Sequence, residues 1–541
     1  MKPQVLLYDT TLRDGTQGEG ISFSVDDKLK IAQKLDGLGI HYIEGGWPGS
    51  NPKDMEFFRK AKDLELKNAT ITAFGSTRRA GIDVSRDENL QKILDSGVKA
   101  VAIFGKTWDF HVREALKTTL DENLDMIYES VQYLKHAGLE VMFDAEHFFD
   151  GYKHNPEYAM ETVKKAQAAG ADSVVLCDTN GGSMPQEIFG IVSDVVSELT
   201  VTVGVHCHND CELGVANSLA GVRAGARHVQ GTINGYGERC GNANLISIIP
   251  NLQMKLGYAC VDEGKMKSLI TVSKYVHEIA NQVPPNNQPF VGKSAFAHKG
   301  GMHVSAILKH PETYEHIPPE SIGNKRRVLV SELSGQSNLL FKAKEWNLQL
   351  DKQDPNSRKI LEKIKEKEHQ GYQYEAAEAS FELMVREGFG DLKEFFQFEH
   401  FKIFIERDEI ETLHTEAVVK LRVNGEVVHT VAEGNGPVNA LDNALRKALE
   451  EYFPLIKNMY LSDYKVRVLD ETDTTASIVR VLIESSDGKE TWSTIGVSAN
   501  IVEASWYALI DSVRYYLMKH EEEIEIVHND KHEQRLGVVN H

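Results

Sequence analysis

The stretch AQAAGADSVVLCD, residues 166–178, shows the pattern on which the predicted fold rests. A helical segment ends at Gly170, and an apolar strand with β-branched residues begins within three positions of it. Glycine after the last helical turn tolerates the positive φ with which many helices end. A strand that is apolar on both faces is typical of a buried parallel sheet. The stretch therefore predicts a helix followed by a parallel strand.

The same pattern occurs four more times in the N-terminal half of the chain. The further copies are LDGLGIHYIEGG (35–46), ILDSGVKAVAIFG (93–105), LKHAGLEVMFDAE (134–146) and VRAGARHVQGT (222–232). Three more apolar strands near 5–9, 69–75 and 202–208 bring the total to eight, with helical segments between them. Eight βα units in about 255 residues match a (β/α)8 TIM barrel. A doubly wound open sheet is the alternative, but eight consecutive parallel units favour closure.

We expect the barrel to cover residues 1–265. The sequence pattern changes twice after it. Amphipathic helical segments with proline-containing breaks fill residues 266–395 and predict helical linker subdomains. Residues 396–525 contain one unit twice, in the order strand, strand, loop and helix. We therefore expect an α/β chain that ends in an α+β domain made of a duplicated β-β-α unit. Residues 526–541 form a polar tail.

The composition limits the partners and the compartment of the protein. The net charge of −20 argues against a nucleic-acid partner, because such binding relies on neutralisation of phosphates by Lys and Arg. Five cysteines in 541 residues do not suggest a disulfide framework and fit reduced thiols in a cytoplasm. No apolar run approaches the ~20 residues that span a bilayer, and the N-terminus lacks a signal-peptide core. We therefore expect a cytoplasmic protein without a membrane partner.

Polar and charged residues gather where the predicted barrel strands end. The active site of such a barrel lies at the C-terminal ends of its strands. The residues at these ends are Arg13 and Asp14, Glu44, Asp144 with Glu146 and His147, Asp178 with Thr179, and His206 to Asp210. An ordinary solvated loop is the alternative explanation for the first cluster.

The stretch VTVGVHCHND, residues 201–210, predicts half of a metal site. Residues i and i+2 of a strand project to the same face, so His206 and His208 point together and Cys207 points away. A carboxylate such as Asp14 would leave coordination positions open for a substrate. The alternative is one satisfied core histidine and one surface histidine. A structural zinc site is disfavoured, because Cys207 faces away and Cys211 has no partner at the usual spacing.

Three further segments carry weaker signals. The glycine-rich loop at 235–245 lacks a Walker or Rossmann spacing, and it is better suited to present Asn242 as an oxygen ligand. A plain βα loop is the alternative. Residues 295–307 place His303 in a glycine-flanked loop that suits a mobile acid–base group. GNKRR at 323–327 is a basic cluster, either solvated or a clamp for a phosphorylated ligand.

Four motifs together resemble a known family. They are DTTLRDGTQ (9–17), HCHND (206–210), CGNANL (240–245) and HKGGMH (298–303). They resemble the metal-dependent acyltransferases and lyases named for the DRE-TIM barrel motif. Within that group the chain is similar to the synthases that condense acetyl-CoA with a 2-oxo acid to give 2-isopropylmalate, homocitrate or citramalate. Stretches such as EHFFDGYKHNPEYAM (146–160) are most similar to the citramalate synthases of this group.

The resemblance implies a metal site and a fold for the whole chain. Asp14, His206, His208 and Asn242 would bind a divalent cation, which could be Mg, Mn, Zn or Co. The barrel, the helical linker and a duplicated C-terminal regulatory domain are the plan of this subgroup. The lyases and aldolases that share the barrel lack the linker motif and the duplicated domain.

The resemblance also implies catalytic and substrate-binding residues. Arg13 would stabilise charge that grows on the keto oxygen of the substrate, and Thr179 would lie near the substrate carboxylate. Glu146 matches the catalytic carboxylate of the family. His303 and Tyr314 match linker residues that act at the active site. Which of Glu146 and His303 takes the proton from acetyl-CoA stays open at this point.

The expected activity is condensation of acetyl-CoA with pyruvate, followed by hydrolysis that releases coenzyme A and feeds isoleucine biosynthesis. The alternative acceptor is 2-oxoisovalerate, as in 2-isopropylmalate synthases. A different class of function is a catalytically silent amino-acid sensor, and the intact set of site residues counts against it. The family further implies a homodimer and an amino-acid effector, such as isoleucine, at the C-terminal domain.

Overall fold

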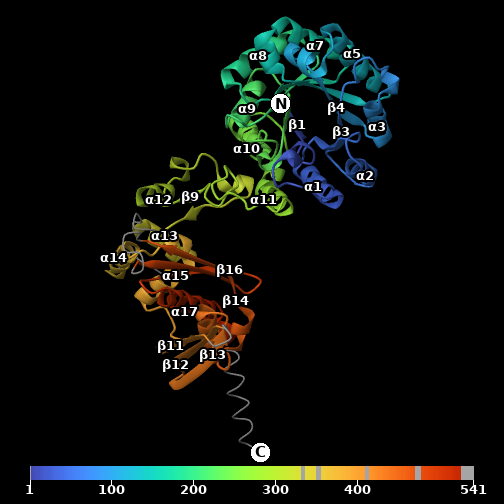
Figure 1. The fold of residues 1–541 in the computed structure, drawn as a ribbon. Coiled ribbons are helices and arrows are strands. Elements are labelled where there is room, and N and C mark those ends of the chain that lie inside the picture. The colour runs from blue at the N-terminus through green and yellow to red at the C-terminus, as the bar shows by residue number, and fades with distance from the viewer. Residues whose placement is uncertain (1, 331–335, 349–354, 408–412, 470–476, 525–541) are drawn as a thin grey trace, which may run out of the picture. The chain divides into compact units, whose positions relative to one another are not determined.

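Eight parallel strands close into a barrel in the N-terminal part of the computed structural model (Figure 1). The barrel strands are β1 (Leu6–Asp9), β2 (Tyr42–Gly46), β3 (Thr70–Ser76), β4 (Ala100–Lys106), β5 (Glu140–Glu146), β6 (Ser173–Asp178), β7 (Thr202–Cys207) and β8 (His228–Gly231). Each strand pairs with the next in sequence, and β1 also pairs with β8. The predicted TIM barrel is therefore confirmed, and the open sheet is excluded.

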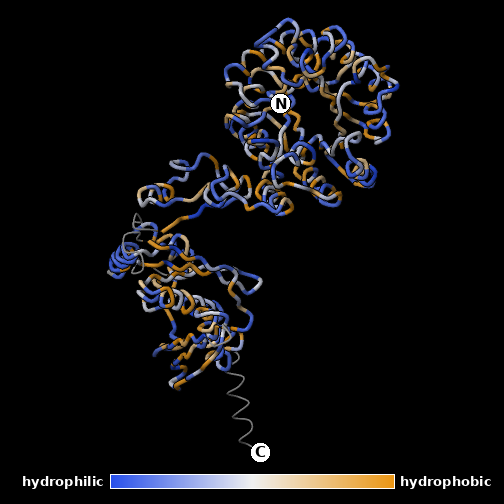
Figure 2. The backbone as a smooth tube through the Cα atoms, in the orientation of Figure 1, coloured by the Kyte–Doolittle hydropathy of each residue, from blue (hydrophilic) through white to orange (hydrophobic). Residues whose placement is uncertain are grey.

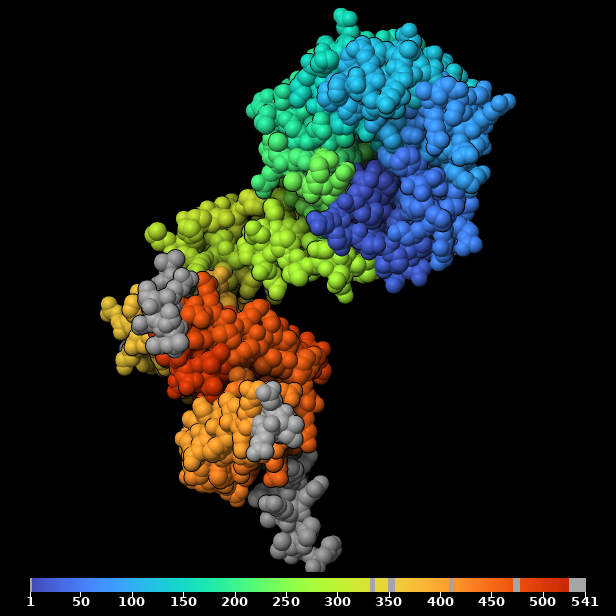
Figure 3. Space-filling view, in the orientation of Figure 1, coloured from blue at the N-terminus to red at the C-terminus, as the bar shows by residue number. Residues whose placement is uncertain are grey.

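Helices surround the strands and cover their outer faces (Figure 1). The helices of this part are α1 (Val25–Leu38), α2 (Pro52–Ala61), α3 (Glu88–Ser96), α4 (Asp109–His111), α5 (Leu120–His136), α6 (Phe148–His154), α7 (Pro156–Ala168), α8 (Pro185–Glu198), α9 (Gly214–Arg223), α10 (Leu245–Pro250) and α11 (Leu269–Ile279). Hydrophobic and hydrophilic segments alternate around this ring (Figure 2). Side chains fill much of the space that the ribbon leaves open (Figure 3). The main apolar core lies between the strands and this layer of helices.

The chain divides into two compact units, of residues 1–296 with 315–326 and of residues 297–314 with 327–541. The structure describes residues 2–330, 336–348, 355–407, 413–469 and 477–524. The tail predicted at 526–541 lies outside them. Among the described residues, none of the helices combines the length and the apolar composition that crossing a membrane requires.

The second unit begins with a helical part that matches the predicted linker in character. Its helices are α12 (Gly301–Ile307), α13 (Gln336–Glu345), α14 (Pro355–His369) and α15 (Glu378–Phe389). Two short strands, β9 (Ala297–His298) and β10 (Arg327–Val328), pair in parallel. A small apolar core joins α13, α14 and α15 to Ile495 of the following domain.

The C-terminal part contains a duplicated unit, and each copy has one strand more than the sequence pattern predicts. The first copy is β11 (Gln397–Arg407), β12 (Leu413–Val423), β13 (Glu426–Gly434) and α16 (Pro437–Leu449). The second copy is β14 (Tyr460–Val468), β15 (Val479–Ser486), β16 (Thr491–Ser498) and α17 (Ile501–Lys519). Each copy forms a three-stranded antiparallel sheet with its own helix packed on it. The added strands β11 and β14 are edge strands, and most of their residues are not buried.

The five glycines of the repeated pattern end their helices as predicted. Gly39, Gly97, Gly138, Gly170 and Gly225 have φ values of 98°, 70°, 85°, 96° and 122°. At such φ values any residue with a Cβ atom is strained, which explains why glycine stands at the same point of each repeat.

A pair of glycine substitutions tests this explanation. Ala at Gly138 would meet no atom within 4 Å, so Gly138→Ala changes only the backbone conformation. We expect it to lower the free energy of unfolding by about 1 kcal/mol. Gly37 lies inside α1 with equally open surroundings, so Gly37→Ala should raise the free energy of unfolding by about 0.5 kcal/mol. Urea unfolding followed by circular dichroism measures both, and equal effects of the two substitutions would contradict the explanation.

Candidate active site

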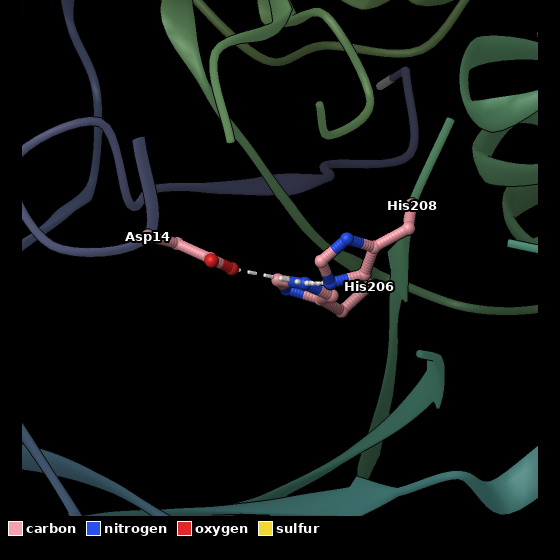
Figure 4. A group of neighbouring side chains, drawn as sticks. All are labelled: Asp14, His206 and His208. Atoms are coloured by element: carbon pink, nitrogen blue, oxygen red, sulfur yellow. Dashed lines mark hydrogen bonds and ion pairs between the residues drawn. The ribbon is translucent and has the colours of Figure 1, made fainter. Parts of the chain in front are cut away.

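Three side chains, from β7 and from the segments that follow β1 and β7, converge at the C-terminal end of the barrel (Figure 4). Asp14 opens a short 3-10 turn five residues after the end of β1, His206 lies on β7, and His208 follows that strand. His206 Nε2 lies 3.4 Å from Asp14 Oδ2 and 3.3 Å from His208 Nε2. The potential ligand atoms of the three residues all lie within 4.8 Å of one another, and all three residues are buried. This is a suitable donor set for a divalent cation.

Asn242 joins this cluster from the loop after β8. Its Nδ2 donates to Asp14 Oδ2 at 2.9 Å. Its Oδ1 is buried and has no hydrogen-bond partner among the described residues. A buried oxygen without a partner costs free energy unless a ligand satisfies it. The unsatisfied amide oxygen therefore fits a fourth metal ligand.

Backbone pairing holds the two loops that carry these ligands together. His208 and Asn242 form an isolated antiparallel bridge, and Asn209 N donates to the Gly241 carbonyl at 2.8 Å. Arg239 adds an ion pair to Asp210, with its Nε 2.7 Å from Oδ1. The β7 and β8 loops consequently form one structural unit at the mouth of the barrel.

The electrostatics favour an ionised Asp14 and a neutral His208. Burial lowers the pKa of His206, but the hydrogen bond and the charge of Asp14 outweigh burial and raise that pKa above its usual value. Burial raises the pKa of Asp14, but Arg13 and the hydrogen bond with His206 outweigh burial and hold that pKa well below its usual range. Burial, followed by the neighbouring His206, lowers the pKa of His208 to about 4. At neutral pH the site therefore offers a carboxylate and a neutral imidazole.

Arg13 is fixed beside the cluster by a buried carboxylate. Its Nε donates to Glu44 Oε1 at 2.5 Å, and its guanidinium carbon lies 3.7 Å from the ring centroid of Phe74. Glu44 is fully buried and also accepts hydrogen bonds from Tyr8 at 2.5 Å and Thr10 at 2.6 Å. These contacts hold the guanidinium in one orientation, 3.6 Å from Asp14 Oδ1.

Glu146 and Thr179 lie at neighbouring strand ends of the same barrel. Glu146 is the last residue of β5 and forms an ion pair with Lys106 at the end of β4. Thr179 directly follows β6, and its Oγ1 accepts a hydrogen bond from the backbone N–H of His147 at 2.9 Å. Because the backbone N–H occupies a lone pair of this hydroxyl, its own proton remains available to donate to an anion.

His303 and Tyr314 belong to the second compact unit. His303 lies on α12, and its ring stacks on that of Tyr314 with 4.1 Å between the centroids. The side chain of Tyr314 is half exposed. The two predicted linker residues are thus brought together, and their role at the barrel mouth stays a prediction.

Two residues at the candidate site, Lys106 and Gln230, were not predicted from the sequence. Lys106 pairs with Glu146, and Gln230 on β8 bridges His206 and Asp144. Lys106 directly follows a predicted strand, so its position among the strand ends was a usable signal. Gln230 is a neutral residue in the middle of a repeat unit, and only its neighbours in space reveal it.

Comparisons with family models divide the chain into three matched segments. Residues 4–276 match the HMGL-like family. Residues 290–371 match the homocitrate synthase post-HMGL domain-like family. Residues 375–517 match the LeuA allosteric (dimerisation) domain.

Curated proteins match the chain over nearly its whole length. The chain is 56% identical to an (R)-citramalate synthase of Aquifex aeolicus, over 97% of this chain and 99% of that protein. It is 57% identical to an (R)-citramalate synthase of Geobacter sulfurreducens, over 96% of this chain and 98% of that protein. A 2-isopropylmalate synthase of Methanocaldococcus jannaschii is 32% identical over 96% of both chains.

Removal of one imidazole tests the metal site. We expect His208→Ala to abolish measurable binding of Mn²⁺ in calorimetric titrations, because it removes one of the converging nitrogen ligands. The unfolding midpoint should change far less than the binding does. His136→Ala, at an exposed position of α5, is the matched control and should bind the cation normally. Unchanged Mn²⁺ binding by His208→Ala would refute the assignment.

Proposed function

The chain belongs to the HMGL-like family, and from this membership we propose that it condenses acetyl-CoA with pyruvate and hydrolyses the product to (R)-citramalate and coenzyme A. The observation that carries the proposal is the full-length similarity to two (R)-citramalate synthases, at 56% and 57% identity. The similarity to a 2-isopropylmalate synthase is much lower, at 32% identity. The chemistry is an acyl transfer in which the acetyl group becomes part of an alkyl chain.

In this proposal Asp14, His206, His208 and Asn242 hold a divalent cation at the mouth of the barrel. The convergence of three ligand side chains and the unsatisfied Asn242 oxygen support this assignment. A bound cation would supply a Lewis acid that polarises the keto group of the 2-oxo acid. The donor set of two imidazoles with oxygen ligands suits Mg, Mn, Zn or Co.

Arg13 is the proposed group that stabilises negative charge on the keto oxygen. Its guanidinium is oriented before substrate binds, because Glu44 and the ring of Phe74 hold it. Donors that are already oriented lose little free energy to reorganisation when charge develops. Thr179 is proposed to donate its hydroxyl proton to the substrate carboxylate, since its oxygen already accepts from the backbone.

The proton of the acetyl methyl group needs a positioned base, because a thioester methyl is a very weak carbon acid. We assign this role to Glu146, whose carboxylate Lys106 holds at the strand ends of the barrel. His303, with Tyr314 stacked on it, is proposed to serve the hydrolysis that releases coenzyme A. Hydrolysis of the thioester drives the reaction towards the product.

The proposal assigns separate tasks to the parts of the chain. Residues 1–265 carry the cation site and the condensation, residues 266–395 form the linker that contributes His303 and Tyr314 to hydrolysis, and residues 396–525 form a regulatory domain. The match of residues 375–517 to an allosteric and dimerisation domain supports a homodimer and an amino-acid effector, for which we propose isoleucine. A cytoplasmic location fits the five cysteines, which are all free thiols.

Release of free thiol from acetyl-CoA tests the activity. With Mg²⁺ or Mn²⁺ supplied, we expect kcat/KM for pyruvate to exceed that for 2-oxoisovalerate at least ~10-fold, because methyl and isopropyl groups differ in the volume they need. 2-Oxoglutarate serves as the third acceptor. Preference for 2-oxoisovalerate would replace the proposal with 2-isopropylmalate synthesis. Absence of thiol release with every acceptor would favour an amino-acid sensor.

Substitution of Arg13 tests its proposed role. Arg13→Lys keeps the positive charge but loses the fork geometry and the stacking on Phe74, so we expect kcat to fall ~10²–10³-fold. Mn²⁺ binding should be kept. Arg386→Lys is the matched control, because the Arg386 side chain is 17% exposed against 14% for Arg13 and pairs with Glu382 and Asp391 in the second compact unit. A kcat within a few-fold of the unchanged protein would exclude the role.

A further inference from the structure

A chain of hydrogen bonds crosses the interior of the barrel behind the candidate metal site. Gln230 on β8 donates from Nε2 to Asp144 Oδ1 on β5 at 2.9 Å. At its other end, Gln230 Oε1 lies 2.8 Å from Nδ1 of His206 on β7. Gln230 is 1% exposed, Asp144 is 4% exposed and His206 is 6% exposed, so solvent provides almost no alternative partner.

The two ends of the Gln230 amide are chemically different, and this fixes the direction of the chain. An ionised carboxylate only accepts hydrogen bonds, so Asp144 selects the NH₂ end of the amide. The carbonyl end must then face His206, and a carbonyl only accepts. His206 therefore donates from Nδ1, and Nε2 is the ring nitrogen that can offer a lone pair.

The nitrogen left free in this way is the one that faces the other candidate ligands. Nε2 of His206 lies 3.4 Å from Asp14 Oδ2 and 3.3 Å from His208 Nε2. The second histidine has no comparable support, because its Nδ1 is buried without a hydrogen-bond partner among the described residues. The barrel thus orients one of the two imidazoles through a dedicated chain of side chains.

We propose that Gln230, oriented by Asp144, is a positioning residue that fixes the Nδ1-protonated tautomer and the ring orientation of His206 for a divalent cation. The proposal deepens the proposed function and depends on it only through the metal site. It does not depend on which 2-oxo acid is the acceptor. Partners of this kind raise metal affinity ~10–100-fold by fixing the tautomer and orientation of a ligand.

Two substitutions of Gln230 separate positioning from packing. Gln230→Met keeps the length of the side chain but accepts no strong hydrogen bond, so Mn²⁺ affinity should fall ~10–100-fold. Gln230→Glu keeps an oxygen that accepts from His206 Nδ1. Two adjacent buried carboxyls share one proton, which replaces the amide N–H towards Asp144, so the affinity should return close to that of the unchanged protein. Calorimetric titration of the metal-free full-length protein with Mn²⁺ measures both. Burial raises the pKa of Asp144 to about 7, so titrations at pH 8 keep its carboxylate ionised.

A spectroscopic measurement reports the tautomer itself. In metal-free protein labelled with ¹⁵N-histidine, the long-range ¹H–¹⁵N correlation of His206 should show a proton on Nδ1. In Gln230→Met the same ring should become a mixture of tautomers. Gln253→Met is the matched control, because Gln253 is buried and accepts from the backbone N–H of Val261 at 3.2 Å outside the site. It should leave both the affinity and the tautomer unchanged.

Four outcomes would overturn the inference. They are unchanged Mn²⁺ affinity in Gln230→Met, an unchanged tautomer in that variant, an equal loss of affinity in Gln253→Met, and absence of Mn²⁺ binding by the unchanged protein. Because the titrations contain no substrate, their result is independent of the acceptor assay. A protein that binds Mn²⁺ through the oriented His206 but releases no thiol would support the inference and refute the proposed function.

Discussion

The pairing of β1 with β8 is the contact on which the candidate site depends. Four registered residue pairs, from Leu6 with His228 to Asp9 with Gly231, close the sheet into a barrel. This closure places the turn after β1 beside the ends of β7 and β8. Asp14 thereby lies 3.4 Å from His206 and 2.9 Å from Asn242, and its ligand atom is within 4.8 Å of that of His208. An open sheet would leave the first and last strands at opposite edges, and the ligands would be far apart.

The same closure gives the barrel a polar interior beneath the site. Tyr8, Glu44, Asp144 and Gln230 come from four strands and are all nearly or fully buried. Buried charges are costly unless hydrogen bonds satisfy them. Glu44 accepts from three side chains, and Asp144 accepts from Gln230. An apolar barrel core would pack more simply, so these residues are best explained by the groups that they orient, Arg13 and His206.

Much of the fold was predictable because its signals are local. The helix-ending glycines and the apolar strands recur with the period of a βα unit, and their count gave the barrel. The strands β11 and β14 were missed although β13 and β16, the other edge strands of the same sheets, were predicted. The tight turns Asn424-Gly425 and Asp487-Gly488 mark the hairpins of β13 and β16, and no such turn was identified for β11 or β14. Their presence follows from pairing with β12 and β15, which is information that a single segment does not contain.

The candidate site shows the same division between local and spatial information. Asp14 was predicted as a site residue because it follows a strand end. His206 and His208 were predicted because alternate residues of a strand project to the same face. Gln230 was not predicted, because a neutral amide inside a strand has no charge or spacing that marks it. His303 and Tyr314 were suggested by resemblance to a family, and the stacking of their rings adds a physical link between them.

The pairing of β1 with β8 also has a consequence for synthesis of the protein. Asp14 and Asn242 are separated by 228 positions along the chain. A ribosome must therefore complete nearly the whole barrel before the two side chains can meet. One edge of β1 has no partner strand until β8 has been synthesised. The entropy cost of closing so long a loop grows only slowly with its length. Assembly of the candidate cation site consequently requires β8, and a chain released before β8 carries Asp14 and both histidines without the geometry that joins them.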